Sequence, residues 1–562
     1  MDVSYDLCVN ESDIEGCAQG DDDAYWEMLA GELSGEPGTS ATDSAPTRHE
    51  SSRRRRTRLP VDVDSGKLFS ELRDTFGYDS FRPGQQEVVE AALSGVDCLA
   101  VMPTGSGKSL TYQLAARLTG GTTLVVSPLI ALMKDQVDAA TETGITATFI
   151  NSSIEQGERA RRIARLRAGD YELVYVAPEG LAASVGSVLD DVDVRLIAVD
   201  EAHCISQWGH DFRPAYRRLV GLKSRFGVPV LALTATATDR VRRDIATQLD
   251  LADPLVVQTS FFRPNLKLHV FKKGKQAGSV QVRVRDYIGR ICTQRRGESG
   301  IVYTLSRKSA ESTAEYLRSI GIRAGAYHAG LDVETRTRVQ DDFIRDDIDV
   351  VCATVAFGMG IDKSNVRFVI HRDMPKSIEG YYQEIGRAGR DGLDSDCFLF
   401  YSWADVIQFD RMISGSENQT SQARQVRAMY TLAEGAGCMH RAVAGYFGET
   451  IDRCASSCDR CTDLGANLHE VATPRAKRTP PASLPVEAQD LFEELRTLRK
   501  RLANERQVPA YMVFNDATLR GMATSLPSNS TELLAVSGVG AAKLESYGDD
   551  FLEAINDWVA RA

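Results

Sequence analysis

The sequence LAVMPTGSGKS, residues 99–109, decides the fold of the region around it. Its first four residues form an apolar run typical of a buried strand, and its last seven form a glycine-rich loop that leads into a helical stretch. Glycines allow the loop backbone to curl so that several N–H groups point inward, where they can hold a phosphate. The order of strand, loop and helix therefore predicts a nucleotide-binding α/β domain.

The residues of this loop suit the phosphates of a nucleoside triphosphate. Lys108 can neutralise charge on the β- and γ-phosphates, and Ser109 can hold Mg²⁺. The strict pattern GxxxxGK[ST] has glycine where this chain has Met102, so the match is imperfect. A glycine loop that arose by chance is the alternative, and the strand–loop–helix context disfavours it. We expect the phosphates and the ion to be bound by Thr104, Gly105, Ser106, Gly107, Lys108 and Ser109.

An acidic pair follows a second apolar run, RLIAVD (residues 195–200). Because parallel strands end at the same edge of a sheet, Asp200 and Glu201 are expected close to the glycine-rich loop. Asp200 would then hold Mg²⁺, and Glu201 would take a proton from the attacking water. An Asp–Glu pair in a loop is common by chance, but its place on a parallel strand after the glycine-rich loop favours the catalytic interpretation.

Strand-like and helical stretches alternate from about residue 66 onward, which indicates βαβ units on a parallel sheet. The pattern restarts after Arg263–Asn265, so the sequence predicts two α/β domains in tandem. Strands are expected at residues 97–102, 122–128, 173–178, 195–200 and 228–236, and again at 300–304, 322–328, 349–354 and 367–373.

The second α/β half carries the segment Gln383–Arg390, QEIGRAGR. Arg387 and Arg390 are three residues apart and would share one face of a helix. Such a pair suits a reach toward a γ-phosphate held by the first half, where it would stabilise transition-state charge. Taken alone, the segment could equally be a basic turn.

The net charge of −12 comes from the first 50 residues, which hold 13 acidic residues and one arginine. Residues 51–562 hold 65 basic and 65 acidic residues, so any track for nucleic acid must be a local groove. Residues 1–60 are expected to form a disordered acidic tail. Within it, Asp21–Leu33 is interpreted either as part of a solvated tail or as a short amphipathic helix that docks a protein partner.

Membrane insertion and secretion are not expected. No stretch approaches the ~18–20 consecutive apolar residues of a membrane helix, and the N-terminus lacks the basic and apolar regions of a signal peptide. The sequence therefore predicts a cytoplasmic protein, associated with the nucleoid if the source is prokaryotic.

Four of the 11 cysteines cluster late in the chain, with the spacing Cys438-x15-Cys454-x3-Cys458-x2-Cys461. In a cytosolic protein such a cluster indicates metal binding before disulfides. Four thiolates suit tetrahedral Zn²⁺ and leave no open position, which favours a structural ion. Free cysteines in a loop are the alternative, and His440 is a possible competing ligand.

The residues after the acidic pair carry a specific resemblance. The segment DEAHCISQWGHDFRPAY (residues 200–216) is similar to the aromatic-rich loop of RecQ helicases, a family within superfamily 2. Aromatic faces stack on unpaired bases and arginine binds phosphate, which agrees with this resemblance. A role for the aromatic residues in the core is the alternative. The resemblance implies that contact with single-stranded DNA is coupled to hydrolysis by His203, Trp208, His210, Phe212 and Arg213.

The segment FGYDSFRPGQ (residues 76–85) looks like the adenine-binding motif of the same family. The resemblance implies that Tyr78 and Arg82 sandwich the base and that Gln85 hydrogen-bonds its edge. Because such hydrogen bonds discriminate adenine from other bases, ATP is the expected nucleotide. Without the resemblance, this segment would indicate only the start of a helix.

The last segment, about residues 486–562, resembles the helical HRDC module. Its turn Gly538-Val539-Gly540 opens a helix, as in turns that contact phosphates. The segment holds 8 basic and 12 acidic residues, so protein contact or simple tethering is as good an interpretation as DNA binding.

The resemblance implies an α/β fold with two tandem RecA-like parallel-sheet domains, a helical zinc-binding subdomain and an HRDC bundle. The expected boundaries are 1–60 for the tail, 66–262 and 263–408 for the RecA-like domains, 409–463 for the zinc-binding subdomain, 464–485 for a linker and 486–562 for the bundle.

The resemblance also implies a function. We expect an ATP-dependent 3′→5′ DNA helicase that moves on single-stranded DNA and unwinds duplex or branched DNA in recombination and repair, with ATP, Mg²⁺ and Zn²⁺. Many RecQ relatives carry a winged-helix domain after the zinc cluster, but only 24 residues separate Cys461 from Val486 here. A DNA-annealing or remodelling factor with weak unwinding is therefore one alternative, and an RNA helicase of the same enzyme class is another.

Overall fold

The computed structural model describes residues 64–561, apart from 129, 152–153, 184, 210, 275–282, 355–356, 358–362, 416–418, 463, 465–485 and 507. The predictions for the acidic tail, for most of the linker and for His210 lie outside these residues. The chain divides into the units Met1–Thr57 and Arg58–Ala562, and the description below concerns the second. None of the described helices combines the length and apolar character that crossing a bilayer requires.

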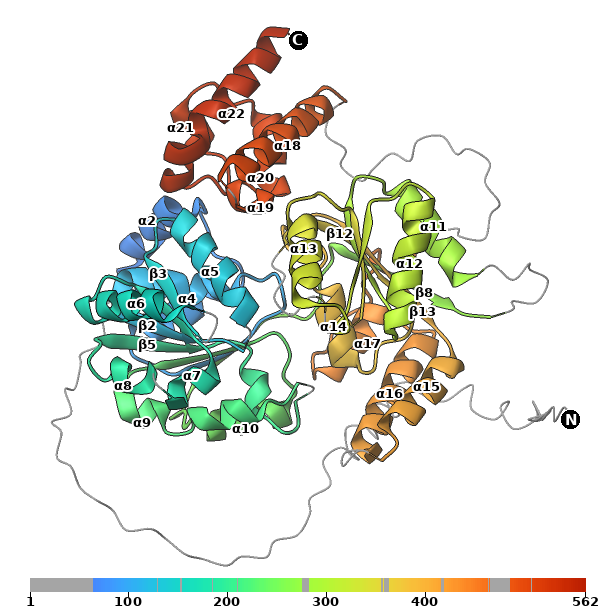
Figure 1. Ribbon diagram of the computed structural model, residues 1–562, viewed down its shortest axis with the longest axis horizontal. Helices are drawn as coiled ribbons and strands as arrows, with labels where there is room; N and C mark the ends of the chain where they lie inside the picture. The colour runs from blue at the N-terminus through green and yellow to red at the C-terminus, as the bar shows by residue number, and fades with distance from the viewer. Residues whose placement is uncertain are drawn as a thin grey trace, which may run out of the picture. The chain divides into compact units, whose positions relative to one another are not determined.

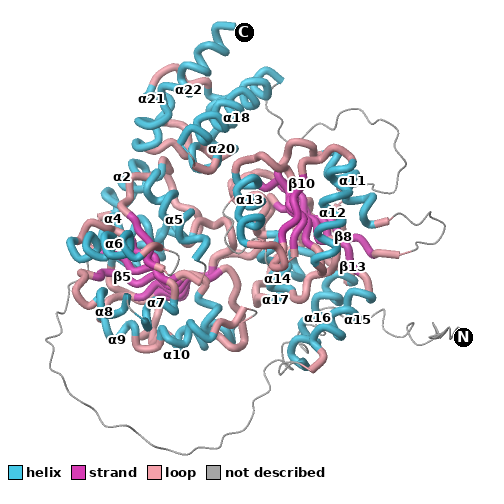
Figure 2. Tube along the Cα trace, viewed as in Figure 1, coloured by secondary structure: helices cyan, strands magenta, loops and turns pink. Residues whose placement is uncertain are grey.

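We call residues 64–258 lobe 1, 266–401 lobe 2, 403–462 the zinc subdomain and 486–561 the terminal module. Figure 1 shows these regions in chain order from blue to red, and Figure 2 shows the strands gathered in two groups, one in each lobe. The two parallel-sheet α/β domains of the expected fold class are confirmed.

Lobe 1 contains a seven-stranded parallel sheet in the order β3-β4-β2-β5-β6-β1-β7. The central strands are buried along their whole length because helices cover both faces of the sheet, which explains their unbroken apolar runs. The strands are β1 (Cys98–Val101), β2 (Thr122–Val126), β3 (Ala147–Ile150), β4 (Leu173–Val176), β5 (Val194–Val199), β6 (Val230–Thr234) and β7 (Leu255–Gln258).

The helices of lobe 1 follow the strands in βαβ order. They are α2 (Ser65–Phe76), α3 (Gln85–Leu93), α4 (Lys108–Thr119), α5 (Ile130–Glu142), α6 (Gln156–Ala168), α7 (Pro178–Ala183), α8 (Val185–Leu189), α9 (Leu222–Phe226) and α10 (Asp239–Gln248), with the 3₁₀ segments η2 (Ala202–Ile205) and η3 (Pro214–Leu219).

Lobe 2 contains a six-stranded parallel sheet in the order β10-β11-β9-β12-β13-β8. Its strands are β8 (Leu266–Lys272), β9 (Ser299–Tyr303), β10 (Ala324–Tyr327), β11 (Val350–Ala353), β12 (Val366–His371) and β13 (Ser395–Tyr401). Its helices are α11 (Val284–Gln294), α12 (Arg307–Ser319), α13 (Val333–Ile344) and α14 (Ile378–Ile385). The short segment between β7 and β8, residues 259–265, joins the two lobes.

The zinc subdomain consists of α15 (Trp403–Ile413), α16 (Gln419–Glu434), α17 (Met439–Tyr446) and a cysteine-bearing loop. This loop lies along the outer side of β8. The N–H of Leu268 donates to the carbonyl oxygen of Ser457 (2.9 Å), and the N–H of Asp459 donates to that of Leu268 (3.0 Å). The Asp459 carboxylate accepts from the N–H of Val270 (2.7 Å). The zinc subdomain is therefore joined to the sheet of lobe 2.

The terminal module is a bundle of five helices, α18 (Val486–Arg506), α19 (Ala510–Val513), α20 (Asp516–Ser525), α21 (Ser530–Leu534) and α22 (Ala541–Arg561). It has its own core, in which Phe514 packs edge-on against Phe551 with ring centroids 5.0 Å apart. Arg499 is buried in this core, where its guanidinium pairs with Asp516 (2.8 Å).

Candidate nucleotide and nucleic-acid site

A cavity of about 440 Å³ brings residues of both lobes together. This volume lies in the range of small-molecule sites. Lobe 1 contributes the glycine-rich loop and the acidic pair, and lobe 2 contributes the end of α14 and the residues after it. Among the lining residues are Tyr78, Arg82, Gln85, Thr104, Gly105, Gly107, Lys108, Ser109, Asp200, Glu201, His203, Arg213, Gln383, Arg387 and Arg390.

The glycine-rich loop curls as the sequence predicts. Gly105 and Gly107 have φ values of 84° and 81°, in the left-handed region that glycine adopts without strain. A Cβ on Gly107 would lie 2.5 Å from Nε2 of Gln85, so a side chain there would displace the Gln85 amide. The Lys108 ammonium donates to the carbonyl oxygen of Met102 (3.0 Å) at the base of the loop. Met102 itself is buried in the core, which explains why a large side chain is accepted there.

The three residues expected at the adenine base lie beside this loop. Tyr78 and Arg82 line the cavity, and the Arg82 guanidinium donates to the carbonyl oxygen of Gly105 (2.5 Å). The amide group of Gln85 bridges two segments, because it donates to the carbonyl oxygen of Ser106 (2.9 Å) and accepts from the N–H of Arg82 (2.9 Å). The base-binding segment and the phosphate loop are thus hydrogen-bonded to each other.

The acidic pair lies at the end of β5. Burial, together with the charge of Glu201, raises the pKa of Asp200 to about 7, although Lys108 partly offsets this rise. Glu201 has a φ of 48°, a left-handed conformation that is strained for a residue with a side chain. The Asp200 carboxylate and the Ser109 hydroxyl line the same cavity. They are hard oxygen ligands of the kind that Mg²⁺ prefers, so these residues fit the ion.

A chain of polar contacts runs from the acidic pair to lobe 2. The His203 imidazole contacts the Glu201 carboxylate (3.3 Å) and the Thr234 hydroxyl (2.9 Å) through Nδ1. The Thr234 hydroxyl donates to the carbonyl oxygen of Thr236 (3.1 Å). The Thr236 hydroxyl in turn accepts from the amide of Gln383 on α14 (3.4 Å). The two threonines therefore lie on a connected path between the lobes.

The aromatic-rich loop presents its rings to solvent. Trp208 is 52% exposed and Phe212 is 36% exposed, so neither is a core residue. The Arg240 guanidinium lies over the Trp208 ring, 3.4 Å from its centroid. Arg213 is held in place, because it donates to the carbonyl oxygen of Pro128 (2.9 Å) and pairs with Asp211 (3.0 Å).

The arginines of lobe 2 lie next to the phosphate loop. A Cβ on Gly105 would be 3.3 Å from Cα of Arg390, and one on Gly386 would be 3.1 Å from Cβ of Thr104. Arg387 and Arg390 line the cavity together with Lys108. The structure therefore brings the two lobes' catalytic candidates into one cavity.

The terminal module also lines this cavity, which the sequence did not suggest. Its contribution consists of Tyr511, Met512, Asn515 and Lys543. Burial lowers the pKa of Lys543 to about 8, although Glu142 offsets part of this fall, and its ammonium donates to the carbonyl oxygen of Met512 (2.6 Å). The Tyr547 hydroxyl donates to the Glu142 carboxylate of lobe 1 (2.9 Å).

The glycine turn of the module does not face solvent. The N–H of Gly538 donates to the carbonyl oxygen of Gly77 (2.9 Å), and Val539 is fully buried. A Cβ on Gly540 would lie 2.9 Å from the carbonyl oxygen of Thr75 in α2. The turn therefore packs against the end of α2 in lobe 1.

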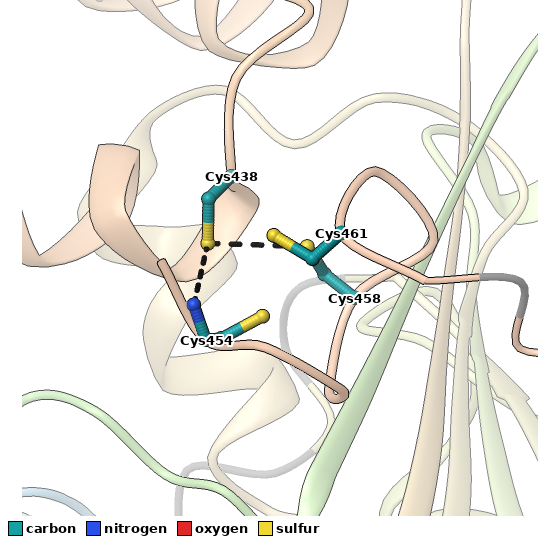
Figure 3. A group of neighbouring side chains, drawn as sticks. All are labelled: Cys438, Cys454, Cys458 and Cys461. Carbon is teal, nitrogen blue, oxygen red and sulfur yellow. Dashed lines mark hydrogen bonds between the residues drawn. The ribbon is translucent and has the colours of Figure 1, made fainter. Parts of the chain in front are cut away.

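The four clustered cysteines point their sulfur atoms toward one another (Figure 3). All four Sγ atoms lie within 4.8 Å of one another, and those of Cys438 and Cys458 are 3.9 Å apart. A tetrahedral ion with Zn–S bonds of about 2.3 Å needs sulfurs about 3.8 Å apart, so these residues fit Zn²⁺. Burial opposes ionisation of Cys438, but backbone N–H groups of Cys454 and Arg441 lower its pKa to about 7. His440 instead contacts the carbonyl oxygens of Leu266 and Ser457.

Comparison with known proteins matches four family models along the chain. They are the DEAD/DEAH box helicase (residues 82–245), the helicase conserved C-terminal domain (283–392), RecQ zinc-binding (403–462) and the HRDC domain (488–555). An ATP-dependent DNA helicase RecQ of Pasteurella multocida is 37% identical over 593 residues, which cover 86% of this chain and 93% of that protein. The chain belongs to the RecQ family. It is an ATP-dependent DNA helicase.

A second RecQ relative is similar over most of the chain as well. The ATP-dependent DNA helicase RecQ of Bacillus subtilis is 36% identical over 586 residues, covering 86% of this chain and 98% of that protein. Among solved structures, the DUF1998 helicase MrfA bound to DNA and AMPPNP aligns with a TM-score of 0.50 and 16% identity. That match covers 72% of this chain and 57% of the other, and it supports the fold alone.

The alignments also bear on the winged helix. The Pasteurella alignment spans 593 positions, whereas 86% of this chain is about 483 residues, so the RecQ relative carries about 110 positions that this chain lacks. Only residues 463–487 lie between the zinc-binding and HRDC matches. This RecQ protein therefore has little chain in which to place a further domain at that point.

Proposed function

We propose that this RecQ protein translocates 3′→5′ along single-stranded DNA and unwinds duplex and branched DNA in recombination and repair. The observation that carries the proposal is the single cavity lined by Lys108, Glu201 and Arg387. Hydrolysis at such a cavity requires both lobes, so each cycle of ATP binding and release closes and reopens the cleft. A strand held across both lobes would then advance stepwise.

The phosphate end of the cavity has the following roles. The loop N–H groups and Lys108 bind the β- and γ-phosphates. Ser109 and Asp200 would hold Mg²⁺, which neutralises phosphate charge when bound. Glu201, beside Asp200, accepts the proton of the attacking water. At the base end, Tyr78 and Arg82 stack on the two faces of the adenine. Gln85 hydrogen-bonds the adenine edge.

Arg387 and Arg390 stabilise the charge that develops on the γ-phosphate. Both belong to lobe 2, so they are correctly placed only when the lobes are closed. Guanidinium groups in this role raise turnover by about 10³- to 10⁵-fold in related phosphoryl-transfer enzymes. This dependence makes hydrolysis conditional on the position of lobe 2.

Contact with DNA reaches the site through the aromatic-rich loop. Trp208 and Phe212 stack on unpaired bases, and Arg213 binds phosphate. His203 belongs to this loop, and its imidazole contacts both the Thr234 hydroxyl and the Glu201 carboxylate. A shift of the loop on DNA binding would therefore change the orientation of the general base.

Two substitutions test the hydrolytic roles. Lys108→Ala and Glu201→Gln are expected to abolish ATPase activity stimulated by single-stranded DNA, and wild-type turnover in either variant would contradict the mechanism. Direction is tested on duplexes with 3′ or 5′ tails, where displacement from the 3′-tailed substrate alone is expected. Greater stimulation by single-stranded RNA than by DNA would favour an RNA helicase.

A second candidate function is DNA annealing or remodelling with weak unwinding. It is favoured by the short connection between the zinc-binding and HRDC matches, because RecQ winged helices are thought to split the duplex. The two candidates differ in a strand-displacement assay on forks, tailed duplexes and four-way junctions. Strong DNA-stimulated ATPase activity without displacement would favour remodelling. The proposal also includes a protein partner for the acidic N-terminal segment and a cytoplasmic location, associated with the nucleoid if the source is prokaryotic.

A further inference from the structure

The segment that joins the lobes, residues 259–265, is anchored to lobe 2 and to the zinc subdomain. Phe261 stacks on Phe447 with ring centroids 4.5 Å apart and an interplanar angle of 13°. Its carbonyl oxygen accepts from the Tyr382 hydroxyl (3.0 Å), and its N–H donates to the Glu449 carboxylate (2.6 Å). Arg263 lies two residues after Phe261. It is therefore fixed to lobe 2.

The guanidinium of Arg263 binds four backbone carbonyl oxygens. One nitrogen donates to Gly386 (2.9 Å) and also to Thr104 (3.1 Å), and the other donates to Ala388 (2.9 Å) and Gly389 (2.7 Å). Three of these acceptors belong to the loop that follows α14 and carries Arg387. The fourth belongs to the phosphate loop of lobe 1. One planar group thus joins the two loops.

Only arginine suits this position. A guanidinium offers five donors in a rigid plane, whereas a lysine ammonium is a compact point charge. The acceptors of lobe 2 lie at and beyond the C-terminal end of α14, where helix carbonyls carry partial negative charge. Those carbonyls offset the cost of burying the cation. Burial nevertheless lowers the pKa of Arg263.

We infer that Arg263 is a positioning residue that sets Arg387 and Arg390 against the phosphate loop and reports the state of that loop to lobe 2. Phosphate binding draws in the loop that contains Thr104, and the shared guanidinium transmits this movement to residues 386–389. The inference rests on the proposed roles of Arg387 and Arg390. It adds a residue that is not among those lining the cavity and that acts through those two.

The chain offers a matched control in Asn265. Its side-chain amide donates to the carbonyl oxygens of Gly389 (3.0 Å) and Leu393 (3.1 Å), so it holds the same arginine-bearing loop. Both of these acceptors belong to lobe 2. Asn265→Ala therefore loosens the loop without touching the connection to Thr104, whereas substitution of Arg263 removes both.

The test uses the full-length protein with single-stranded DNA and compares Arg263→Lys, Arg263→Ala and Asn265→Ala with wild type. Misplacement of a reacting group by about 1 Å costs about 10²-fold in rate. We expect both Arg263 variants to lose about 10²-fold in ATPase kcat with KM for ATP within about threefold. Asn265→Ala should lose less than about tenfold. Added guanidinium ion should restore Arg263→Ala at least tenfold and leave Asn265→Ala unchanged.

Several outcomes would overturn the inference. A wild-type kcat in Arg263→Lys would show that charge alone suffices. A raised KM for ATP with unchanged kcat in the Arg263 variants would show that Arg263 contributes to ATP binding and not to the rate of hydrolysis. Failure of guanidinium rescue in a variant with wild-type melting temperature and zinc content would assign Arg263 a purely structural role. If Arg263→Ala does not fold, the ATPase kcat of Arg263→Lys alone tests the inference.

A combined substitution separates this inference from the proposed function. If Arg263 acts through Arg387 and Arg390, adding Arg263→Lys to the variant that carries both Arg387→Ala and Arg390→Ala should make it no slower, because the three residues then act as a unit. Independent, multiplied losses would contradict the inference. If Arg387→Ala and Arg390→Ala both keep wild-type kcat, the proposed roles of those arginines fail instead, whatever Arg263 does.

Discussion

The backbone N–H of Gly538 donates a hydrogen bond of 2.9 Å to the carbonyl oxygen of Gly77 and so joins the terminal module to lobe 1. Gly77 ends α2 with a φ of 72°, directly before the base-binding residue Tyr78. A Cβ on Gly77 would lie 2.4 Å from the carbonyl carbon of Val539. The module is therefore packed against the segment that is expected to hold the adenine.

Gly77→Ala should release the terminal module from lobe 1. The variant adds steric overlap with Val539 to the ordinary cost of a side chain in the left-handed region, about 1 kcal/mol. Gly95→Ala is the control, because Gly95 has a φ of 75° but nothing within 4 Å of its Cβ position. Hydrogen exchange at Gly538 and Val539 should accelerate at least tenfold in Gly77→Ala only. Equal protection in the two variants would contradict this contact.

Trp208→Ala should weaken the response to single-stranded DNA. Base stacking on an aromatic ring contributes about 1–3 kcal/mol, so the DNA concentration for half-maximal ATPase stimulation should rise at least about fivefold. Because Trp208 is half exposed, the melting temperature should change little. Trp403 is equally exposed (50%) but lies in the zinc subdomain, so Trp403→Ala serves as the control. The idea fails if both variants respond to DNA alike.

Zinc removal should destabilise the cysteine-bearing loop. Chelation of the wild-type protein, or the substitution Cys454→Ser, should lower the melting temperature and remove one equivalent of zinc, because metal-binding energy becomes folding energy at a structural site. Cys292→Ala is the control, since Cys292 is buried in lobe 2 outside the cluster. Full zinc content in Cys454→Ser would contradict the four-cysteine site.

The folded state in which Lys543 of the terminal module is buried should become more stable as the pH rises above 8. Burial lowers the pKa of Lys543 to about 8 from an ordinary value of 10.5. Between these values the exposed amine binds a proton that the buried amine has lost, so raising the pH favours the buried state. The melting temperature of wild type relative to Lys543→Met should therefore increase between pH 8 and 10. A constant or falling difference would show that Lys543 is not buried in solution.

The local patterns in the sequence pointed to residues that the structure brings close together. The glycine-rich loop and the acidic pair each occupy a few consecutive residues whose spacing is fixed by a strand that ends and a helix that begins. Arg387 and Arg390 were also recognised, because their segment is contiguous. The structure brings all three groups to one cavity.

Some strands could not be predicted for physical reasons. β3 and β7 are the two edge strands of the lobe 1 sheet. β3 alternates half-buried and buried residues, and Leu255 and Val256 of β7 are exposed, so neither forms a buried apolar run. β8 is an edge strand of its sheet, and Lys267, His269 and Lys272 interrupt its apolar residues.

Contacts to backbone atoms could not be predicted from the sequence either. Arg263 marked only the boundary between two domains, because its acceptors are carbonyl oxygens more than 100 residues away, and a carbonyl oxygen has no residue type. The same holds for the turn at Gly538, whose partner is the backbone of Gly77. Such contacts depend on how folded segments meet and leave no spacing in the sequence.

The cysteine-bearing loop has a consequence for solubility. The backbone of β8 at Leu268 and Val270 would otherwise present open hydrogen-bonding groups at the end of a parallel sheet, and the loop at Ser457–Asp459 occupies them. An uncovered edge of this kind is a template on which a second chain can add a strand. Oxidation of the cysteines would therefore do more than unfold a small loop: it would turn one side of lobe 2 into a surface for self-association.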